Sequence, residues 1–573
     1  MKKLLVYMKE YKKECVLGPL FKLLEASFEL LVPMVMAAVI DTGIAHGDKN
    51  YIIRMCLVLV GLGVVGLVCS ITAQFFAAKA SVGFAAKIRQ ALFGRIQGLS
   101  YAQMDQQGSA TLITRMTSDI NQVQNGMNLT LRLLLRSPFV VFGAMAMAFM
   151  IDWKAALVFA VVIPLLSVVV FGVMLWTMPR YKQVQAGLDR VLGATRENLT
   201  GVRVVRAFGR EQAETQAFEA ENDRLTRLQV FVAKVSALMN PVTYILINLG
   251  TVAVIWAGAK QVDQGVITQG AVVALVNYMA QILVELVKLA NLIINITKAL
   301  ACANRVADVL ELEPGLASPA QGRQGSGASV EFRKVGLTYQ GSGEPALEGI
   351  TFSAGSGQTI GVIGGTGSGK SSVVNLIPRF YQATAGQVLV GGVDVACWPL
   401  DELRQKIGVV PQKAMLFAGT IRENLLWGRK DAGDQELWQA LTAAQAADFV
   451  KDKPKGLDEL VEQGGKNFSG GQRQRLTIAR ALVRCPEILI LDDSASALDF
   501  ATDAKLRQAI RNLPNRPTVF IVSQRASSIR YADQIVVLDD GMAVGVGTHD
   551  QLLEDCQVYR EIYESQFERG EGA

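Results

Sequence analysis

The sequence lacks the cysteine patterns that mark a metal-binding or disulfide-bonded protein. Its 573 residues include seven cysteines, and none forms a CxxC pair or another metal-ligand spacing. Scattered cysteines of this kind indicate reduced thiols. A secretory signal peptide is also missing, because the apolar core of MKKLLVYMKEYKKE is too short and no small-residue cleavage site follows it. We interpret this basic stretch as a cytoplasmic helix that lies at a membrane interface.

A concentrated block of basic charge is missing as well. The net charge is a modest +6, and the Lys and Arg residues cluster beside long apolar runs. That distribution is typical of membrane orientation and argues against nucleic acid as a partner. Half of the residues (50%) are hydrophobic, and the long apolar runs lie before about Leu300. The sequence therefore predicts a membrane half followed by a soluble half.

Six apolar segments in the first half are long enough to cross a bilayer, which takes about 20 mostly apolar residues because backbone amides must be satisfied within the helix. Short, nearly neutral loops alternate with two long connections that hold many Lys and Arg residues. The long connections and both chain termini are therefore predicted to be cytoplasmic. The predicted spans are Val16–Ile44, Tyr51–Ala77, Leu131–Ile151, Ala155–Met178, Pro241–Gly258 and Val272–Ile296.

Each long connection carries one distinct patch. These are GSATLITRMTSDI, Gly108–Ile120, and ENLTGVRVVRAFGRE, Glu197–Glu211. Gly and Thr followed by apolar and Arg residues suit a short transverse helix that docks on another domain. An ordinary solvated helix turn is the alternative.

Ionisable side chains inside the predicted spans are costly, so they indicate function. In the last span the polar residues fall on one side of the helix at about 100° per residue, and two acids of the first span can extend the same wall. We expect these side chains to line a water-filled substrate pathway, although pairing with neighbouring helices would also explain them. The predicted pathway residues are Glu25, Glu29, Asn277, Gln281, Glu285 and Lys288.

The soluble half begins after a Gly-, Pro- and Ser-rich linker, Glu311 to Ser329. Strand-like and helical runs then alternate, which predicts an α/β domain with a parallel sheet. The motif GGTGSGKS, Gly364 to Ser371, follows the strand-like run TIGVI and has the spacing of a P-loop. Its glycines let backbone N–H groups close around phosphates, Lys370 adds charge, and the Ser371 hydroxyl suits Mg²⁺. The domain is predicted to bind ATP with Mg²⁺.

Two further motifs refine this prediction. The run ILIL ends at Asp492, where a carboxylate would hold Mg²⁺ through its water shell. In NFSGGQRQRLTIARAL, Ser469, Gly470 and Gly471 open a predicted helix and form a second anion site at backbone N–H groups. One nucleotide does not need two such helix starts. If two domains pack head-to-tail, however, the second site can close over the γ-phosphate bound by the other domain.

GGTGSGKS, Gln412 in VVPQ, FSGGQ, LILDD and SALD stand in the order of an ATP-binding-cassette (ABC) domain. With six preceding spans and long cytoplasmic extensions, nearly the whole chain resembles a bacterial ABC exporter half-transporter. The resemblance implies a polytopic α-helical membrane domain with six transmembrane helices, followed by an α/β P-loop ATP-binding cassette. The implied domains are residues 1–310 for the membrane domain, 311–329 for the linker and 330–573 for the cassette.

The resemblance also implies roles for individual residues. Tyr339 would stack on adenine, Gln412 would contact Mg²⁺ and couple the cassette to the membrane domain, and Asp499 would lie between two cassettes. The two transverse patches would be coupling helices, the second docking on the partner's cassette. The implied ATP-binding residues are Tyr339, Gly364, Gly365, Thr366, Gly367, Ser368, Gly369, Lys370, Ser371, Ser372 and Gln412. The implied Mg²⁺ ligands are Ser371, Gln412 and Asp492, and the segment acting on the partner's ATP is Ser469, Gly470, Gly471 and Gln472.

Two positions depart from the family's catalytic pattern. Asp493 replaces the expected Glu, and Gln524 replaces the expected His. Asp is one methylene shorter, and a misplacement of about 1 Å can cost about a hundredfold in rate. Gln524 can hydrogen-bond to a γ-phosphate, but its amide cannot take up charge as an imidazole can. Both changes leave binding groups intact and impair hydrolysis.

An intact signature segment beside impaired catalytic residues resembles the degenerate-site subunit of a heterodimeric multidrug-type exporter. This implies a second half-transporter with intact Glu and His, a bacterial plasma-membrane location, alternating access, and export of amphipathic small molecules, lipids or peptides. Two alternatives stay open. One is a slow homodimeric transporter that uses Asp493 as its base, and the other is an ATP-gated pore or sensor.

Overall fold

The structure is a computed structural model that describes residues 3–313, 315–316, 325, 327, 329–494 and 498–567. It divides into two compact units. The helical unit contains residues 3–97 and 110–312, and the α/β unit contains residues 98–109 and those from 313 onward. Most of the predicted linker, Glu311–Ser329, lies outside the described residues.

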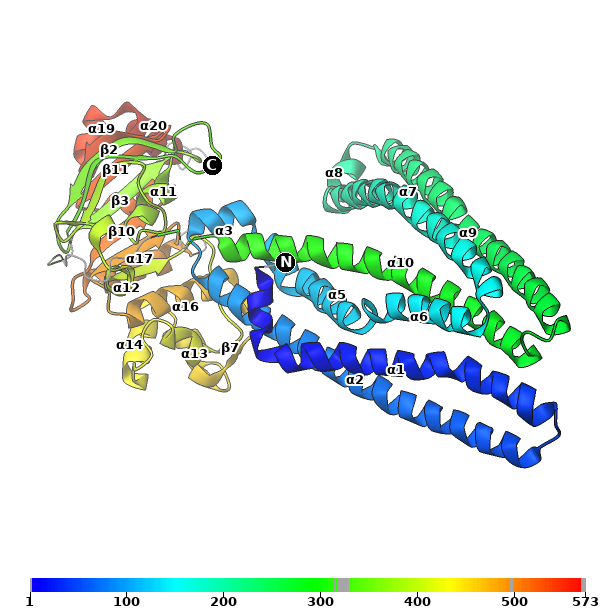
Figure 1. Ribbon diagram of the computed structural model, residues 1–573. Coiled ribbons are helices and arrows are strands. Elements are labelled where there is room, and N and C mark those ends of the chain that lie inside the picture. The colour runs from blue at the N-terminus through cyan, green and yellow to red at the C-terminus, as the bar shows by residue number, and fades with distance from the viewer. Residues whose placement is uncertain are drawn as a thin grey trace. The chain divides into compact units, whose positions relative to one another are not determined.

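Across the described ranges, six helices are long and apolar enough to cross a membrane (Figure 1). Each predicted span lies inside one of them, so the six-span prediction is confirmed. The helices are 41 to 53 residues long, well beyond the roughly 20 residues that a bilayer needs. They run Leu4–Ile44, Lys49–Gln97, Ser109–Ile151, Trp153–Thr200, Glu211–Asp263 and Gln269–Glu311.

These long helices contain shorter segments with local irregularities. The 3-10 helix at Leu4–Tyr11 leads into α1, and π-helical turns follow α1 and α4. Pro241 lies inside α9, where its missing N–H removes one helical hydrogen bond. The segments are η1 Leu4–Tyr11, α1 Lys12–Ala38, η2 Val39–Ile44, α2 Lys49–Gln97, α4 Ser109–Thr114, η3 Arg115–Asp119, α5 Ile120–Leu133, α6 Arg136–Ile151, α7 Trp153–Thr200, α8 Val202–Ala207, α9 Glu211–Asp263 and α10 Gln269–Glu311.

Helix α10 packs against α1, α5, α6, α7 and α9. Its Tyr278 is fully buried and donates a 2.6 Å hydrogen bond to the carbonyl oxygen of Leu30 in α1. Gly126 of α5 faces Ala299 of α10 so closely that a Cβ added at Gly126 would lie 2.1 Å from the Ala299 Cβ. Small residues at such crossings allow close backbone approach, which is how helices associate in a membrane.

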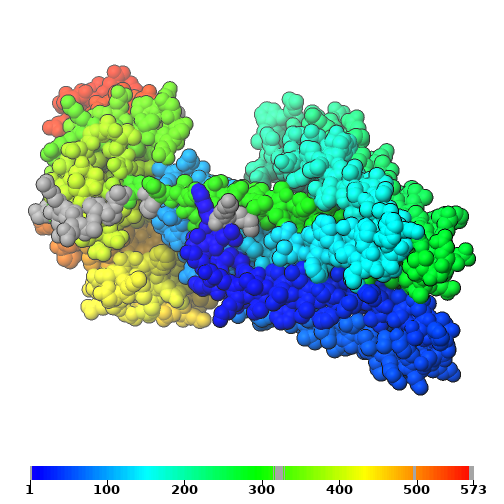
Figure 2. All heavy atoms as spheres, in the orientation of Figure 1, coloured from blue at the N-terminus to red at the C-terminus, as the bar shows by residue number. Residues whose placement is uncertain are grey.

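Helices α7 and α9 form a long antiparallel pair joined by α8, and Figure 2 shows the α8 end of this pair (teal) as a projection of the helical unit. No residue of α8 is buried. Its neighbourhood exposes large apolar side chains, with Leu199 72%, Val204 60% and Phe208 76% exposed. The second predicted patch, Glu197–Glu211, therefore does contain a short helix with an apolar surface.

The α/β unit contains two main sheets. The central sheet has the order β12-β11-β3-β10-β9-β6 and is parallel except for β12, and the antiparallel sheet has the order β2-β1-β4-β5. The strands are β1 Val330–Leu337, β2 Leu347–Ala354, β3 Thr359–Gly364, β4 Ala385–Val390, β5 Val393–Asp394, β6 Ile407–Val410, β7 Gly419–Thr420, β8 Leu460–Val461, β9 Ile488–Asp492, β10 Thr518–Val522, β11 Gln534–Asp539 and β12 Met542–Gly547. The α/β prediction is confirmed.

Helices cover the central sheet, and the two apolar cores of the unit lie on its faces. Strand β9, which carries the predicted magnesium-binding acid, is buried along its whole length. The helices are α11 Lys370–Leu376, α12 Leu400–Lys406, α13 Ile421–Leu426, α14 Asp434–Ala443, α15 Ala447–Lys451, α16 Gly470–Val483, α17 Phe500–Arg511, α18 Ala526–Ile529, α19 His549–Asp555 and α20 Gln557–Phe567.

The prediction of a transverse helix at Gly108–Ile120 is wrong. That stretch begins the third long helix, and the short helix is α3, Tyr101–Gln107, just before it. The side chains of Ser100 and Gln103 form a capping box that starts α3, and Gly108 ends it with φ +73°, a backbone conformation that favours glycine. Figure 1 shows α3 beside the α/β elements, the unit to which it belongs.

Gly126→Ala should destabilise the helical unit. The new Cβ would overlap the Ala299 Cβ, and forcing extra volume into a packed contact costs about 1–3 kcal/mol. We expect a lower thermal unfolding midpoint in lipid nanodiscs, followed by intrinsic fluorescence. The control is Gly94→Ala on exposed α2, where no atom lies within 4 Å of an added Cβ. Equal midpoints for the two variants would contradict the close α5–α10 contact.

Candidate functional site

A cavity of about 320 Å³ lies at the carboxyl ends of β3, β9 and β10. Parallel strands present their carboxyl ends at one edge of a sheet, which is where α/β folds bind ligands. The loops after these strands bring together most of the predicted nucleotide-site residues. Those lining the cavity are Tyr339, Thr366, Gly367, Gly369, Lys370, Ser371, Ser372, Gln412, Asp492, Asp493 and Gln524.

The P-loop between β3 and α11 shapes the floor of this cavity. Gly367 and Gly369 adopt φ +88° and +90°, which other residues rarely do. Gly364 and Gly365 lie behind the cavity lining and accept hydrogen bonds from Lys370 Nζ, at 3.0 and 2.5 Å. Ser368 is also a predicted ATP-binding residue, but it is buried within the loop and does not line the cavity.

The charged groups that line this cavity are one cation, Lys370, and two acids, Asp492 and Asp493. Burial lowers the pKa of Lys370, and the neighbouring Asp493 and Asp492 oppose that shift. Burial raises the pKa of Asp492, and the hydrogen bond from Ser371 partly offsets this. Each carboxylate stabilises the ammonium, so a triphosphate entering here would meet a cation already partly compensated.

The oxygen atoms that a magnesium ion would need are present. Ser371 Oγ donates a 2.9 Å hydrogen bond to Asp492 Oδ1, and Gln412 lines the same cavity. Hydroxyl, carboxylate and amide oxygens are the hard ligands that Mg²⁺ prefers, and Mg²⁺ keeps several waters when it binds beside phosphates. The residues therefore fit Mg²⁺, which would neutralise phosphate charge when bound.

The two departures from the catalytic pattern face this same cavity. Asp493 has φ +46°, and its N–H donates a 3.0 Å hydrogen bond to the Val522 carbonyl at the end of β10. The short acid is thus fixed on a backbone conformation that Asp tolerates better than most residues. The backbone position from which the Asp493 side chain extends is therefore fixed at the end of β9.

The loop that carries Gln524 is held by a residue that sequence reasoning did not identify. Gln566 of α20 donates from Nε2 to the Gln524 carbonyl at 2.8 Å and accepts at Oε1 from the Ala526 N–H at 2.9 Å. These bonds pin the backbone on both sides of Arg525. The sequence offers no signal for this contact, because Gln566 lies on an ordinary amphipathic helix 42 residues away from Gln524.

Tyr339 lies at the rim of the cavity. Its hydroxyl is 2.8 Å from Ser372 Oγ, and its ring meets Tyr381 edge-on with 5.1 Å between centroids. These contacts fix the ring plane, which is a requirement for stacking on a base.

The signature segment lies away from the cavity lining. Ser469 is exposed and caps α16, a 14-residue helix, with its Oγ accepting from the Gln472 N–H while Gln472 Oε1 accepts from the Ser469 N–H. Gln472 is thus engaged with its own helix. Asp499 caps α17 through Thr502, contacts that lower its pKa, and the adjacent Phe500 is 70% exposed. Both helix starts present polar groups to the surface.

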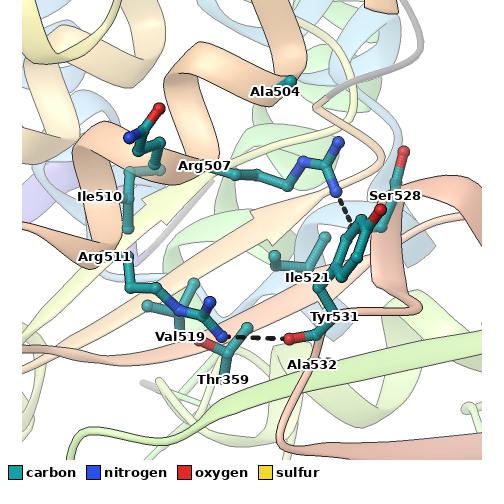
Figure 3. A pocket seen from close by; sticks show the side chains of 11 residues that line it. Thr359, Ala504, Arg507, Ile510, Arg511, Val519, Ile521, Ser528, Tyr531 and Ala532 are labelled. Carbon is teal, nitrogen blue, oxygen red and sulfur yellow. Dashed lines mark hydrogen bonds between the residues drawn. The ribbon is translucent and has the colours of Figure 1, made fainter. Parts of the chain in front are cut away.

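A second cavity of the α/β unit, about 230 Å³, lies between α17 and α18 at the other end of the sheet (Figure 3). Arg507 donates to the carbonyls of Ser527 and Ser528, and Arg511 donates to that of Tyr531. These bonds tie α17, which starts at Asp499, to the segment that follows Gln524. The sequence does not predict this link between α17 and the segment after Gln524, a residue that lines the nucleotide cavity.

The helical unit brings three of the six predicted pathway residues, Glu29, Glu285 and Lys288, into one charged cluster. Its centre is Arg136 of α6, which sequence reasoning did not select although it lies in a predicted span. Arg136 pairs with Glu29 of α1 and with Glu285 of α10, at 2.6 Å each. Glu285 also accepts from Ser137 and from Lys288, at 2.9 Å each. The pairing alternative considered from the sequence therefore applies to Glu285.

Two cavities adjoin this cluster and share Glu29 and Val32 in their walls. The first, about 500 Å³, is also lined by Asn277, Gln281 and Lys288. The second, about 580 Å³, is also lined by Glu25, which pairs with Lys22 at 2.6 Å. All six predicted pathway residues thus border one of the two cavities.

Comparison with known proteins agrees with this architecture. Family models described as "ABC transporter transmembrane region" and "ABC transporter" match residues 15–286 and 347–496. An ABC transporter ATP-binding protein of Mycobacterium tuberculosis is 37% identical over 98% of this chain and 97% of its own length. YfiB of Bacillus subtilis, also named an ABC transporter ATP-binding protein, is 36% identical over 99% of each chain.

A solved structure extends the likeness to the fold. A bacterial Atm1-family ABC exporter with ATP bound has a TM-score of 0.79 and 22% identity, covering 97% of this chain and 98% of that one. The match spans the six long helices and the α/β unit in one alignment. This chain therefore belongs to the ABC transporter family, as a multi-pass membrane half-transporter that fuses one membrane region to one ATP-binding cassette.

Proposed function

We propose that this chain is one subunit of an ATP-driven exporter that works by alternating access with a second, different half-transporter in a bacterial plasma membrane. The observation that carries the proposal is the content of the nucleotide cavity. The binding groups Lys370, Ser371 and Asp492 stand together there, beside Asp493 and Gln524 in place of the catalytic Glu and His. Such a site binds ATP with Mg²⁺ and hydrolyses it slowly.

The partner carries, at its own site, the catalytic Glu and His that this chain lacks, and this chain's signature segment completes that partner site. In a head-to-tail pair, exposed Ser469 and the first amides of α16 face the partner's γ-phosphate, where a helix start stabilises an anion. Asp499 and exposed Phe500 lie at the same interface. Hydrolysis then takes place at the partner-based site, and ATP in this chain's site persists as a regulator.

Coupling between nucleotide and membrane uses the two short helices in different ways. Helix α3 docks on the cassette of its own unit, where Tyr101 stacks on Phe380 at 4.5 Å and Tyr381 donates to Asp105 at 2.6 Å. The exposed apolar residues around α8 suit docking on the partner's cassette. Nucleotide binding that favours one arrangement of the cassettes thereby shifts the membrane helices between their two orientations.

A homodimer with Asp493 as a slow base is the second candidate, and the intact signature segment fits it too. It would place two impaired sites in one assembly. An ATP-gated pore differs from both, because it would conduct substrate only down its gradient. The composition of the native assembly distinguishes the heterodimer from the homodimer. Uphill transport distinguishes both of them from the ATP-gated pore.

Intact-mass analysis of the chain pulled down from native membranes, at its natural expression level, tests the pairing directly. We expect a second half-transporter of similar size in equal amount, carrying Glu and His at the two catalytic positions. Recovery of this chain as a dimer with itself would refute the heterodimer and leave the slow homodimer.

Steady-state ATP hydrolysis by the purified assembly tests the asymmetry. Asp493→Asn should lower the rate by less than about twofold, because the partner-based site carries the turnover, whereas replacing the partner's catalytic Glu by Gln should lower it on the order of a hundredfold or more. The double change Asp493→Glu and Gln524→His should raise the rate, since it supplies the missing base and imidazole. Equal losses from the two single changes would contradict the assignment.

Tyr101→Ala should weaken the coupling of α3 to the cassette. Losing a stacked ring pair costs about 0.5–1.5 kcal/mol beyond its buried area, so ATP should drive the membrane helices less completely. Spin labels at the ends of α1 and α9 would report this as a smaller ATP-dependent distance change with unaltered ATP affinity. Tyr101→Phe keeps the ring and is the matched control. A Tyr101→Ala response equal to that of Tyr101→Phe would exclude the stacked pair from coupling.

A further inference from the structure

The charged cluster of the helical unit contains two buried central groups and two half-exposed end groups. Arg136 and Glu285 are only 7% and 4% exposed, and each is bonded to more than one partner. Glu29 and Lys288, at the two ends of the chain of contacts, are 42% and 45% exposed. The order Glu29–Arg136–Glu285–Lys288 is thus an alternating ladder, with a half-exposed carboxylate at one end and a half-exposed ammonium at the other, each paired on one side only.

The formal charges of the ladder cancel. Arg136 and Lys288 balance Glu29 and Glu285 in the ladder, and the neighbouring Lys22–Glu25 pair is neutral as well. A group of net charge entering such a region would be left without a counter-charge, which is costly in a medium of low dielectric. A group that carries both signs meets both of its counter-charges and leaves the total unchanged.

The cavity of about 500 Å³ joins these ends to an apolar wall. Glu29 and Lys288 both line it, together with the amides of Asn277 and Gln281. Gln281 Oε1 is buried and has no hydrogen-bond partner among the described residues. The remaining wall is largely apolar, with Val32, Pro33, Met36, Val140 and Val284.

We infer that this cavity is the headgroup site for a zwitterionic amphiphile. The cationic group of the headgroup lies at Glu29, the anionic group lies at Lys288, and the amides bond to the atoms between them. The apolar wall takes the start of the hydrocarbon chain. Arg136 and Glu285 are positioning residues that keep the Glu29 carboxylate and the Lys288 ammonium apart. This assignment rests on the proposed export function and adds the substrate class.

The test uses the assembled transporter in nanodiscs of an uncharged galactolipid, which offers neither competing zwitterions nor a surface charge. Three probes with the same tail are compared: dodecylphosphocholine, dodecyltrimethylammonium and dodecyl phosphate, each below its micellar concentration. The concentration for half-maximal stimulation of ATP hydrolysis, corrected for partition into the discs, should be at least about tenfold lower for the zwitterion, a difference of about 1.4 kcal/mol in binding.

Two variants test whether Glu29 binds the cationic group of the headgroup and Lys288 binds the anionic group. Glu29→Gln should weaken binding of the zwitterion and of the cation and strengthen binding of the anion. Lys288→Gln should weaken binding of the zwitterion and of the anion and strengthen binding of the cation. The double variant should lose the preference for the zwitterion while keeping the Arg136–Glu285 pair. Lys298→Gln is the matched control, because Lys298 is exposed on the same helix α10 and lies outside the lining of both cavities.

Equal half-maximal concentrations for the three headgroups would overturn the inference. It would also be overturned if the cationic probe, or the anionic probe, shifted in the same direction in both single variants. Thermal unfolding midpoints confirm that each variant is folded, and the series on the unmodified transporter stands without them. A transporter that shows no ATP hydrolysis would refute the proposed function instead. Calorimetric titration with the three amphiphiles then still decides the headgroup preference.

Discussion

The helical unit depends on one buried guanidinium. Arg136 of α6 joins α1 and α10 by charge-assisted bonds to Glu29 and Glu285, so three helices are fixed in orientation at one level. Removing one partner of a buried ion pair leaves an uncompensated charge and costs about 3–5 kcal/mol. Apolar packing between helices has no such directional preference, since lipid tails are as apolar as the side chains. The orientation of the cavities beside Glu29 follows from this single contact.

The cassette shows the opposite arrangement, because Ser469 and Asp499, the polar caps of α16 and α17, are exposed at the surface. Its nucleotide cavity brings Lys370, Ser371 and Asp492 together, and the capped start of α16 lies outside the lining of that cavity. Hydrogen bonds from Arg507, Arg511 and Gln566 tie helices α17 and α20 to the segment that follows β10. The unit is organised as one face of a larger site.

Sequence reasoning predicted the features that have strict local requirements. Spans must be apolar throughout, and the P-loop must place glycines at positive φ before Lys370, so both are readable from residue order. It failed at Gly108–Ile120, because the capping box at Ser100 and the aromatic contact of Tyr101 determine which neighbouring stretch becomes the short helix. It also missed Arg136 and Gln566, because their partners are 149 and 42 residues away and no local pattern encodes such pairs.

The length of the helices has a mechanical consequence. Helix α9 has 53 residues and, at 1.5 Å per residue, is about 80 Å long. Pro241 divides it, and the stretch before this proline forms an arm of about 45 Å that ends at α8. A tilt of about 10° at the proline moves the tip of that arm by about 8 Å. A small rotation inside the bilayer is thus enlarged into a displacement of several ångströms at the α8 end of this arm.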